Sequence, residues 1–187
     1  MKQGRIWALA LAAVLVITAA GIALARSGPL SSDLQAVRSA VSRFHSYDQA
    51  AAAGYVTAGE PCVSSPGGTM GIHAVNFALL GSGQNDPLEP PILLYIPRAD
   101  GSLRLVAVEY FAVALANTAN GPAPWFEATP PPDGFFNTAP SILGHTFDGP
   151  MPGHNPQMPW HYDMHAWVLE SNPAGTFAPF NPALACP

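Results

Sequence analysis

The chain has 187 residues, with seven Lys and Arg, twelve Asp and Glu, and a formal net charge of −5. Lys2 is the only lysine, and the arginines are too few and too scattered to form the basic face that a nucleic acid requires. Nucleic-acid binding is therefore excluded, and the length suits one domain with a substantial core.

The amino-terminal segment is the first element along the chain. Lys2 and Arg5 precede an apolar run over residues 6–25, which ends in the small-residue pattern Ala23-Leu24-Ala25. This order is typical of a secretory signal peptide, and a run of about 20 apolar residues is also long enough to serve as an uncleaved membrane anchor. In both cases residues 26–187 are expected to form a single extracytoplasmic domain, secreted or held at the outer face of the cell membrane. Its only contact with the membrane would be this segment.

A helix is predicted over residues 33–53, after a short linker. Apolar residues recur there at intervals of three and four, which places them on one face of a helix. The run stops at Gly54, as expected of a helix end. The apolar positions that define the face are Leu34, Val37, Val41 and Phe44.

Strands are predicted in the middle of the chain. A loop rich in Gly, Ser and Pro over residues 57–71 precedes an apolar stretch at 72–80, which is interpreted as a strand. The segments 92–96 and 103–111 are clearer strands, because β-branched and aromatic residues dominate them. Asp-Gly turn chemistry between these two segments predicts an antiparallel hairpin.

A proline-rich segment follows at residues 117–159. Ten prolines lie between positions 122 and 159, which is too many for a regular helix or a central strand. Its aromatic residues are too numerous for a disordered linker, so a long ordered loop packed on the sheet is expected. Residues 160–170 fit a strand or a helix, and their aromatic content favours a strand. The sequence thus predicts an α+β fold, in which an amino-terminal helix packs on a mainly antiparallel β-sheet with a long proline-rich loop.

The two cysteines, Cys62 and Cys186, form an even pair in a chain that is expected outside the cytoplasm. One disulfide is the favoured interpretation, and it would close most of the domain into a single loop. A pair of metal thiolates is the weaker alternative, because Cys186 has no ligand-type residue beside it.

The main candidate for chemistry is the sequence His161-Tyr162-Asp163-Met164-His165. Imidazole and carboxylate groups bind metals and move protons near neutral pH. In a strand, the two histidines and the aspartate point to one face, but the outer two are about 13 Å apart at their backbones, so neighbouring pairs chelate better. In a helix, the two histidines could hold the same ion. A zincin-type protease is excluded, because Tyr162 stands where its catalytic Glu is needed.

Two further residues extend this candidate site. His73 lies in an apolar stretch, and Glu109 interrupts a strand of otherwise apolar residues. A carboxylate in such a strand must face solvent or be buried with a partner. If Glu109 shares a sheet face with His161, the two could share a metal or a proton. A buried carboxylate–histidine hydrogen bond is the alternative.

The segment 147–154 is the third candidate, since its prolines and glycines hold Met151 and His154 in a fixed irregular backbone. These two residues are additional candidate ligands, and a thioether with an imidazole would favour copper. Methionine more often fills gaps in a core. A separate candidate is an apolar ligand pocket lined by Trp125, Phe126, Trp160 and Trp167.

Several motifs occur together between the first helix and Cys186. They are Met70-Gly71-Ile72-His73, Val108-Glu109-Tyr110, Gly149-Pro150-Met151-Pro152-Gly153-His154 and Met158-Pro159-Trp160-His161-Tyr162-Asp163-Met164-His165-Ala166-Trp167. This combination resembles an uncharacterised family of exported bacterial proteins, mostly actinobacterial. The resemblance implies export, and it assigns no catalytic residue and no ligand.

The residues therefore predict an exported domain with a divalent transition-metal site, formed by His73, Glu109, His161 and His165. Asp163 is expected to be a further ligand or to orient one of the ligands. Zinc, iron and copper all suit such ligands, and the binding partner would be the ion or a small molecule. The alternative is a non-catalytic binding or structural domain, in which the cluster is a buried hydrogen-bond network. The sequence shows no nucleophile elbow, phosphate loop or dinucleotide fingerprint.

Overall fold

The computed structural model describes residues 30–57, 59 and 61–187. The predicted signal peptide or anchor at residues 1–25 lies outside the described residues. Within the described ranges, no helix combines the length and the apolar character needed to cross a bilayer.

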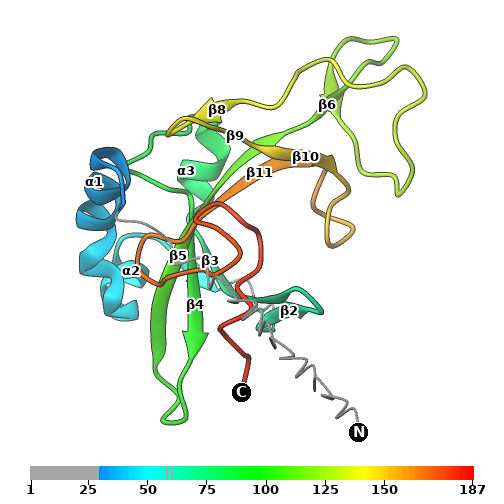
Figure 1. Ribbon diagram of the computed structural model, residues 1–187. Helices are drawn as coiled ribbons and strands as arrows, with labels where there is room; N and C mark the ends of the chain where they lie inside the picture. Colours follow the sequence, from blue (N-terminus) through cyan, green and yellow to red (C-terminus); the bar gives the residue numbers. More distant parts are fainter. Residues whose placement is uncertain (1–29, 58, 60) are drawn as a thin grey trace, which may run out of the picture.

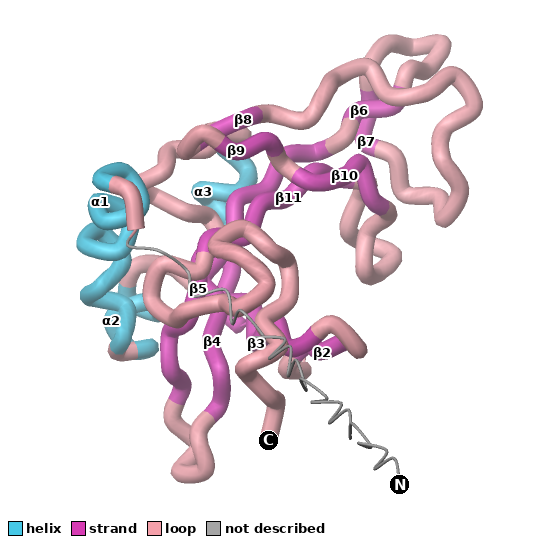
Figure 2. Tube along the Cα trace, in the orientation of Figure 1, coloured by secondary structure: helices cyan, strands magenta, loops and turns pink. Residues whose placement is uncertain are grey.

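A seven-stranded sheet forms the centre of the fold (Figures 1 and 2). The strand order is β1-β3-β4-β5-β11-β10, and β2 pairs with β3 beside this path. All of these pairings are antiparallel, so the predicted mainly antiparallel sheet is confirmed. The strands are β1 (Val56–Thr57), β2 (Val63–Ser65), β3 (Gly68–Val75), β4 (Ile92–Pro97), β5 (Leu103–Val113), β10 (Asp148–Met151) and β11 (His161–Ala166).

The predicted hairpin between residues 92–96 and 103–111 is confirmed as β4 and β5. Its turn is closed by a hydrogen bond of 2.8 Å from Arg98 N–H to Ser102 O. The Asp100 carboxylate accepts a second one, of 2.9 Å, from Ser102 N–H. Gly101 has a φ of 83°, in the left-handed region that glycine enters without strain. The opposite edge of β5 pairs with β11, so β5 is a central strand.

Successive residues of the central strands point to opposite faces of the sheet. Leu93 of β4 and Tyr110 of β5 belong to a core cluster that also contains the buried residues of the amino-terminal helices. Leu94 of β4 and Phe111 of β5 belong to a separate cluster, which also contains Trp167. We call the first the helix face and the second the site face. Residues 160–170, for which a strand was favoured, do contain a strand, β11.

The single helix predicted over residues 33–53 is wrong, because the segment is broken into three pieces. They are α1 (Ser32–Val41), the 3-10 helix η1 (Ser42–His45) and α2 (Tyr47–Ala52). The break has a tertiary cause: the Tyr95 hydroxyl donates a hydrogen bond of 2.7 Å to the Phe44 carbonyl. The Phe44 carbonyl therefore accepts a hydrogen bond from β4 instead of one from the next turn of the helix.

The strand predicted at residues 72–80 and the loop predicted at 57–71 are both wrong in their bounds. β3 begins at Gly68 and ends at Val75, and a short helix, α3 (Phe77–Ser82), follows. The Asn76 carboxamide oxygen accepts hydrogen bonds from Ala78 N–H and Leu79 N–H, so Asn76 caps the new helix.

The carboxyl-terminal segment lies against the start of β3. Thr69 and Asn181 exchange backbone hydrogen bonds of 3.0 and 2.9 Å. Gly68 allows this approach, because a side chain there would collide with the backbone of Asn181. The predicted Cys62–Cys186 disulfide is present, with the two Cα atoms 5.8 Å apart, and it fastens the same segment beside β2.

The proline-rich segment is ordered and partly folded back on the sheet. Its strand β7 (Ala123–Pro124) pairs with β6 (Leu115–Ala116), which lies just before the segment, and β8 (Ser141–Ile142) pairs with β9 (His145–Thr146) within it. The part near β6 and β7 projects beyond the end of the sheet in Figure 1. The last part forms β10, an edge strand, where a proline does not interrupt the ladder. The expected loop is therefore only partly packed on the sheet.

Candidate metal centre

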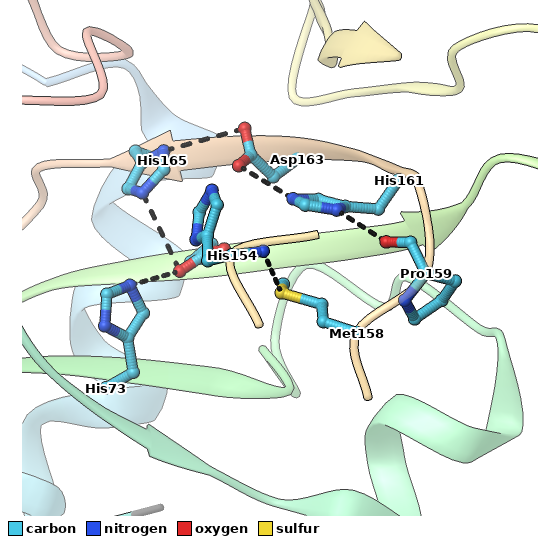
Figure 3. Close-up of polar contacts among 8 residues, drawn as sticks. His73, His154, Met158, Pro159, His161, Asp163 and His165 are labelled. Atoms are coloured by element: carbon cyan, nitrogen blue, oxygen red, sulfur yellow. Dashed lines mark hydrogen bonds and ion pairs between the residues drawn. The ribbon is translucent and has the colours of Figure 1, made fainter. Parts of the chain in front are cut away.

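Three chemistry-bearing side chains from three strands converge on the site face (Figure 3). Glu109 of β5 and His165 of β11 are direct partners in the strand register. Val75 of β3 pairs with Ile92 of β4, and Ile92 pairs with Glu109, so one row of paired residues crosses the sheet from Val75 to His165. His73 lies two residues before Val75 in β3. Side chains two residues apart share a face, so the register alone brings the three together. We call His73, Glu109 and His165 the triad.

A β-bulge in β5 puts Glu109 on this face. The pairing of β4 with β5 shifts at Val106, which leaves one extra residue in β5. Leu105 packs on the helix face, whereas Val106 and Ala107 both pack on the site face. Unbroken alternation from Leu105 would have placed residue 109 under the helices. The extra residue reverses the alternation of side chains along β5, so the Glu109 carboxylate points to the same face as the histidines.

The distances within the triad suit a common ion. His73 Nε2 lies 3.2 Å and His165 Nε2 3.7 Å from the same atom, Glu109 Oε2. One potential ligand atom from each residue lies within 4.8 Å of the other two. Two ligands of a tetrahedral ion, each about 2.0–2.2 Å from it, are about 3.3–3.6 Å apart. The triad is thus within metal-binding distance.

The triad is buried, and this decides its electrostatics. His73, Glu109 and His165 are 8%, 3% and 0% exposed. Burial by itself raises the pKa of Glu109, but the nearby His165 and the hydrogen bond from His73 outweigh it and lower this pKa to about 2. The Glu109 carboxylate is therefore ionised at neutral pH, with the two imidazoles as its immediate neighbours.

Several buried polar atoms around the triad lack hydrogen bonds. Within the described part of the chain, neither ring nitrogen of His165 has a hydrogen-bond partner, and neither Asp163 Oδ1 nor His161 Nε2 has one. Leaving a buried polar atom in this state costs about 1–3 kcal/mol. Such a concentration at one place is typical of a site that holds a further species.

Asp163 lies behind His165 and outside the triad. Its Oδ1 is 3.9 Å from His165 Nδ1, on the side of the ring opposite Glu109. A carboxylate in this position orients an imidazole and increases its basicity when the other ring nitrogen binds a metal. Asp163 is therefore not among the three groups within metal-binding distance of one another, and it lies beside the His165 ring.

His161 is also separate from the triad, because Asp163 lies between them. Its Nε2 is 3.7 Å from Asp163 Oδ2, and its Nδ1 is 3.1 Å from the Pro159 carbonyl, which can only accept a hydrogen bond. The ring stacks on Phe111 with 4.7 Å between the centroids. The structure thus divides the five predicted site residues into a triad and a neighbouring Asp163–His161 pair.

The two additional candidate ligands occupy different positions. His154 is exposed on the loop between β10 and β11, and its ring centroid is 5.4 Å from that of His161. Met151 is the register partner of His161 on β10. Another methionine, Met158, holds the loop through a contact of 3.5 Å between its sulfur and the His154 N–H. The copper-type pairing of thioether and imidazole is therefore not the arrangement of the triad.

A cavity of about 740 Å³ opens beside the triad. His73 and Glu109 form part of its wall, and His154 lines it from the loop. The rest of the wall is mostly apolar and includes Phe111 and Leu80. Volumes of 300–1,000 Å³ are typical of small-molecule sites. His73 and Glu109 are therefore buried polar groups in the wall of a largely apolar chamber.

The tryptophans of the pocket expected from the sequence lie on different faces of the sheet. Trp160 is part of the core cluster on the helix face, and Trp125 packs against that cluster. Trp167 belongs to the cluster on the site face, where its indole N–H donates a hydrogen bond of 2.6 Å to the Ala178 carbonyl. None of the three lines the large cavity, and Phe126 does not line it either.

The part of the cavity wall that α3 forms was not predicted from the sequence. Phe77 and Leu80 line the cavity from this helix. The strand assigned to residues 72–80 concealed them. A usable signal existed, because Asn76 precedes an apolar run and asparagine is among the best N-cap residues.

Comparisons with known proteins add no assignment. No protein-family model matches the chain, and the searches of curated proteins and of solved structures give no significant match. The resemblance to an exported bacterial family accordingly stays a prediction.

Proposed function

We propose that this protein binds one divalent transition-metal ion through His73 Nε2, Glu109 Oε2 and His165 Nε2. The observation that carries the proposal is the convergence of these three buried groups from three strands, with their ligand atoms within 4.8 Å of one another. The absence of hydrogen bonds at either nitrogen of His165 in the described chain adds to it.

The donor set indicates the chemistry. Two imidazoles and one carboxylate suit zinc and non-haem iron, and imidazoles also suit copper. Three protein ligands leave a coordination position for water or a substrate, and an ion held in this way supplies Lewis acidity or an activated water. Asp163 would orient the His165 ring, and Glu109 would supply the negative charge of the ligand set.

The alternative is a hydrogen-bonded network without metal. The 3.2 Å contact between His73 and Glu109 fits that description. The other contacts do not, since 3.7 Å from His165 to Glu109 and 3.9 Å from His165 to Asp163 exceed hydrogen-bond distances. A network would have to leave both ring nitrogens of the fully buried His165 without a hydrogen bond, so the metal site is the better explanation.

The proposed place of action is outside the cytoplasm. The support is the Cys62–Cys186 disulfide, since such bonds persist in oxidising compartments. The same compartment gives access to exogenous metal ions and small molecules.

The test is elemental analysis of the protein purified without an affinity tag or added metal, followed by titration of the metal-stripped protein with Zn²⁺ and Co²⁺. The wild type is expected to bind one equivalent, and His165→Ala and Glu109→Gln are expected to bind none. His45→Ala is the matched control, because His45 is exposed on η1. Circular dichroism shows whether each variant is folded, and Glu109→Gln preserves side-chain shape.

Two outcomes would overturn the proposal. One is a folded wild-type protein that contains no metal and takes up none. The other is a folded Glu109→Gln or His165→Ala variant that binds Zn²⁺ as tightly as the wild type does.

A further inference from the structure

The cavity beside the triad is larger than a metal ion and its water ligands require. Its volume is about 740 Å³, which corresponds to a drug-sized organic molecule. We infer that the metal-loaded protein binds a neutral, mainly hydrocarbon molecule in this cavity, with one hydroxyl or carbonyl oxygen directed at the triad. This inference rests on the proposed metal site and names the class of ligand that the site receives.

The apolar walls of the cavity favour a ligand whose main part is hydrocarbon. Val75 and Ile92 contribute from the sheet, Phe77 and Leu80 from α3, and Met158 from the loop before β11. These side chains come from both sides of the chamber and offer no hydrogen-bonding groups of any strength. A ligand gains binding free energy by burying hydrocarbon surface here.

The charged residues around the cavity indicate which polar group the ligand can carry. No Lys or Arg lines the cavity within the described residues, so a buried carboxylate, sulfate or phosphate would find no cationic side chain. Glu109 offsets part of the charge of a divalent ion, and the mostly apolar walls disfavour the burial of a further charged group. A neutral oxygen therefore fits the head of the ligand best.

A second group of polar residues lies on the exposed loop beside the cavity. His154, Asn155 and Gln157 line it from the loop between β10 and β11. Phe77 of α3 also lines the cavity and is 59% exposed. An elongated molecule would thus enter past a polar loop and an aromatic side chain, with its oxygen leading toward His73 and Glu109.

The inference is tested with a series of probes that share one chain length: 1-octanol, 2-octanone, octanoate and octyltrimethylammonium. Calorimetric titration of Zn²⁺-loaded protein is expected to show the alcohol and the ketone binding at least 10-fold more tightly than either ion. Metal-free protein is expected to bind them at least 10-fold more weakly. In Co²⁺-loaded protein, 2-octanone is expected to change the visible absorption spectrum, which reports on the coordination of the ion.

A pair of variants locates the binding. Leu80→Trp fills part of the cavity and is expected to weaken 2-octanone binding at least 10-fold while Co²⁺ uptake is retained. Leu88→Trp is the matched control, since Leu88 is 50% exposed and outside the cavity, and it is expected to bind as the wild type does. The probe series in the wild type does not depend on either variant.

The outcomes separate this inference from the metal site itself. Metal-loaded protein that binds no probe, or that prefers octanoate, overturns the inference and leaves the metal site standing. Equal binding of the alcohol with and without metal overturns the role of the oxygen head. A protein that takes up no Zn²⁺ or Co²⁺ in the preceding titration overturns the metal site, and this inference with it.

Discussion

Glu109 and His165 face each other across β5 and β11 as register partners, with Glu109 Oε2 3.7 Å from His165 Nε2. This pairing fixes half of the candidate site through the backbone alone. A shift of one residue between the strands would move either side chain to the helix face. The bulge at Val106 sets the face to which this pair points, because it reverses the alternation of side chains between Leu105 and Glu109. The geometry of the candidate metal site thus depends on strand register as much as on the side chains.

Asp163→Asn is expected to weaken Zn²⁺ binding by about 10–100-fold, because the amide loses the charge that supports the His165 ring. A chelator-competition titration measures the change in affinity. Asp133→Asn, an exposed site on the proline-rich loop, serves as the control and should leave the affinity unchanged. Wild-type affinity in a folded Asp163→Asn protein would remove Asp163 from the site.

Tyr55 is expected to make stability fall in alkaline solution. Burial raises its pKa from 10.0 to about 12, and its hydroxyl donates a hydrogen bond of 2.7 Å to Pro90 O. Because the folded pKa is above the unfolded one, this contribution is complete below pH 10 and is lost as the pH rises from 10 toward 12.

The measurement for Tyr55 is the free energy of unfolding of wild type and Tyr55→Phe between pH 8 and pH 11. At pH 8 the variant is expected to be about 1–3 kcal/mol less stable, since the Pro90 carbonyl loses its donor. The difference should shrink above pH 10. A difference that stays constant over this range would contradict the assignment.

Removal of the disulfide is expected to destabilise the fold strongly. The bond joins residues 124 apart in sequence, and the loop-entropy model gives about 4–5 kcal/mol for such a loop. Denaturant unfolding of the Cys62→Ser/Cys186→Ser double variant measures the loss. Dithiothreitol should lower the stability of the wild type and leave the double variant unaffected, and a wild type indifferent to reduction would refute the expectation.

Gly71→Ala is expected to destabilise the protein by at least 1 kcal/mol, because a non-glycine residue is strained at its φ of 113°. The new Cβ would also lie only 2.6 Å from the Tyr95 carbonyl oxygen in β4. Gly81→Ala is the matched control, since Gly81 lies in α3 with open space around it. It should stabilise by up to about 1 kcal/mol through helix propensity. Thermal unfolding compares the two variants.

The elements that the sequence predicted well are those with local signals. The hairpin of β4 and β5 follows from two apolar runs and an Asp-Gly turn, and it is confirmed. The alternation in residues 161–168 also predicted correctly that His161, Asp163 and His165 share one face. The pairing of Cys62 with Cys186 followed from cysteine count and compartment.

The remainder depended on contacts that no local pattern encodes. The helix break near Phe44 comes from the hydroxyl of Tyr95, which is far away in the sequence. The face of the sheet to which Glu109 points depends on the extra residue Val106, and nothing in the sequence distinguishes Val106 from an ordinary strand residue. His161 was grouped with His165 because they share a face, but Asp163 lies between them. Only the register of the folded sheet could show which histidine meets Glu109.

The covalent loop between Cys62 and Cys186 encloses His73, Glu109 and His165. In the oxidised chain, the three donors therefore stay within one ring even after the sheet has melted. Their effective concentration around an ion is higher than in an open chain of the same length, because a closed loop restricts how far its members can separate. If the triad binds an ion as proposed, an ion bound by the melted ring would draw β3, β5 and β11 together, and metal uptake would then assist refolding of the sheet.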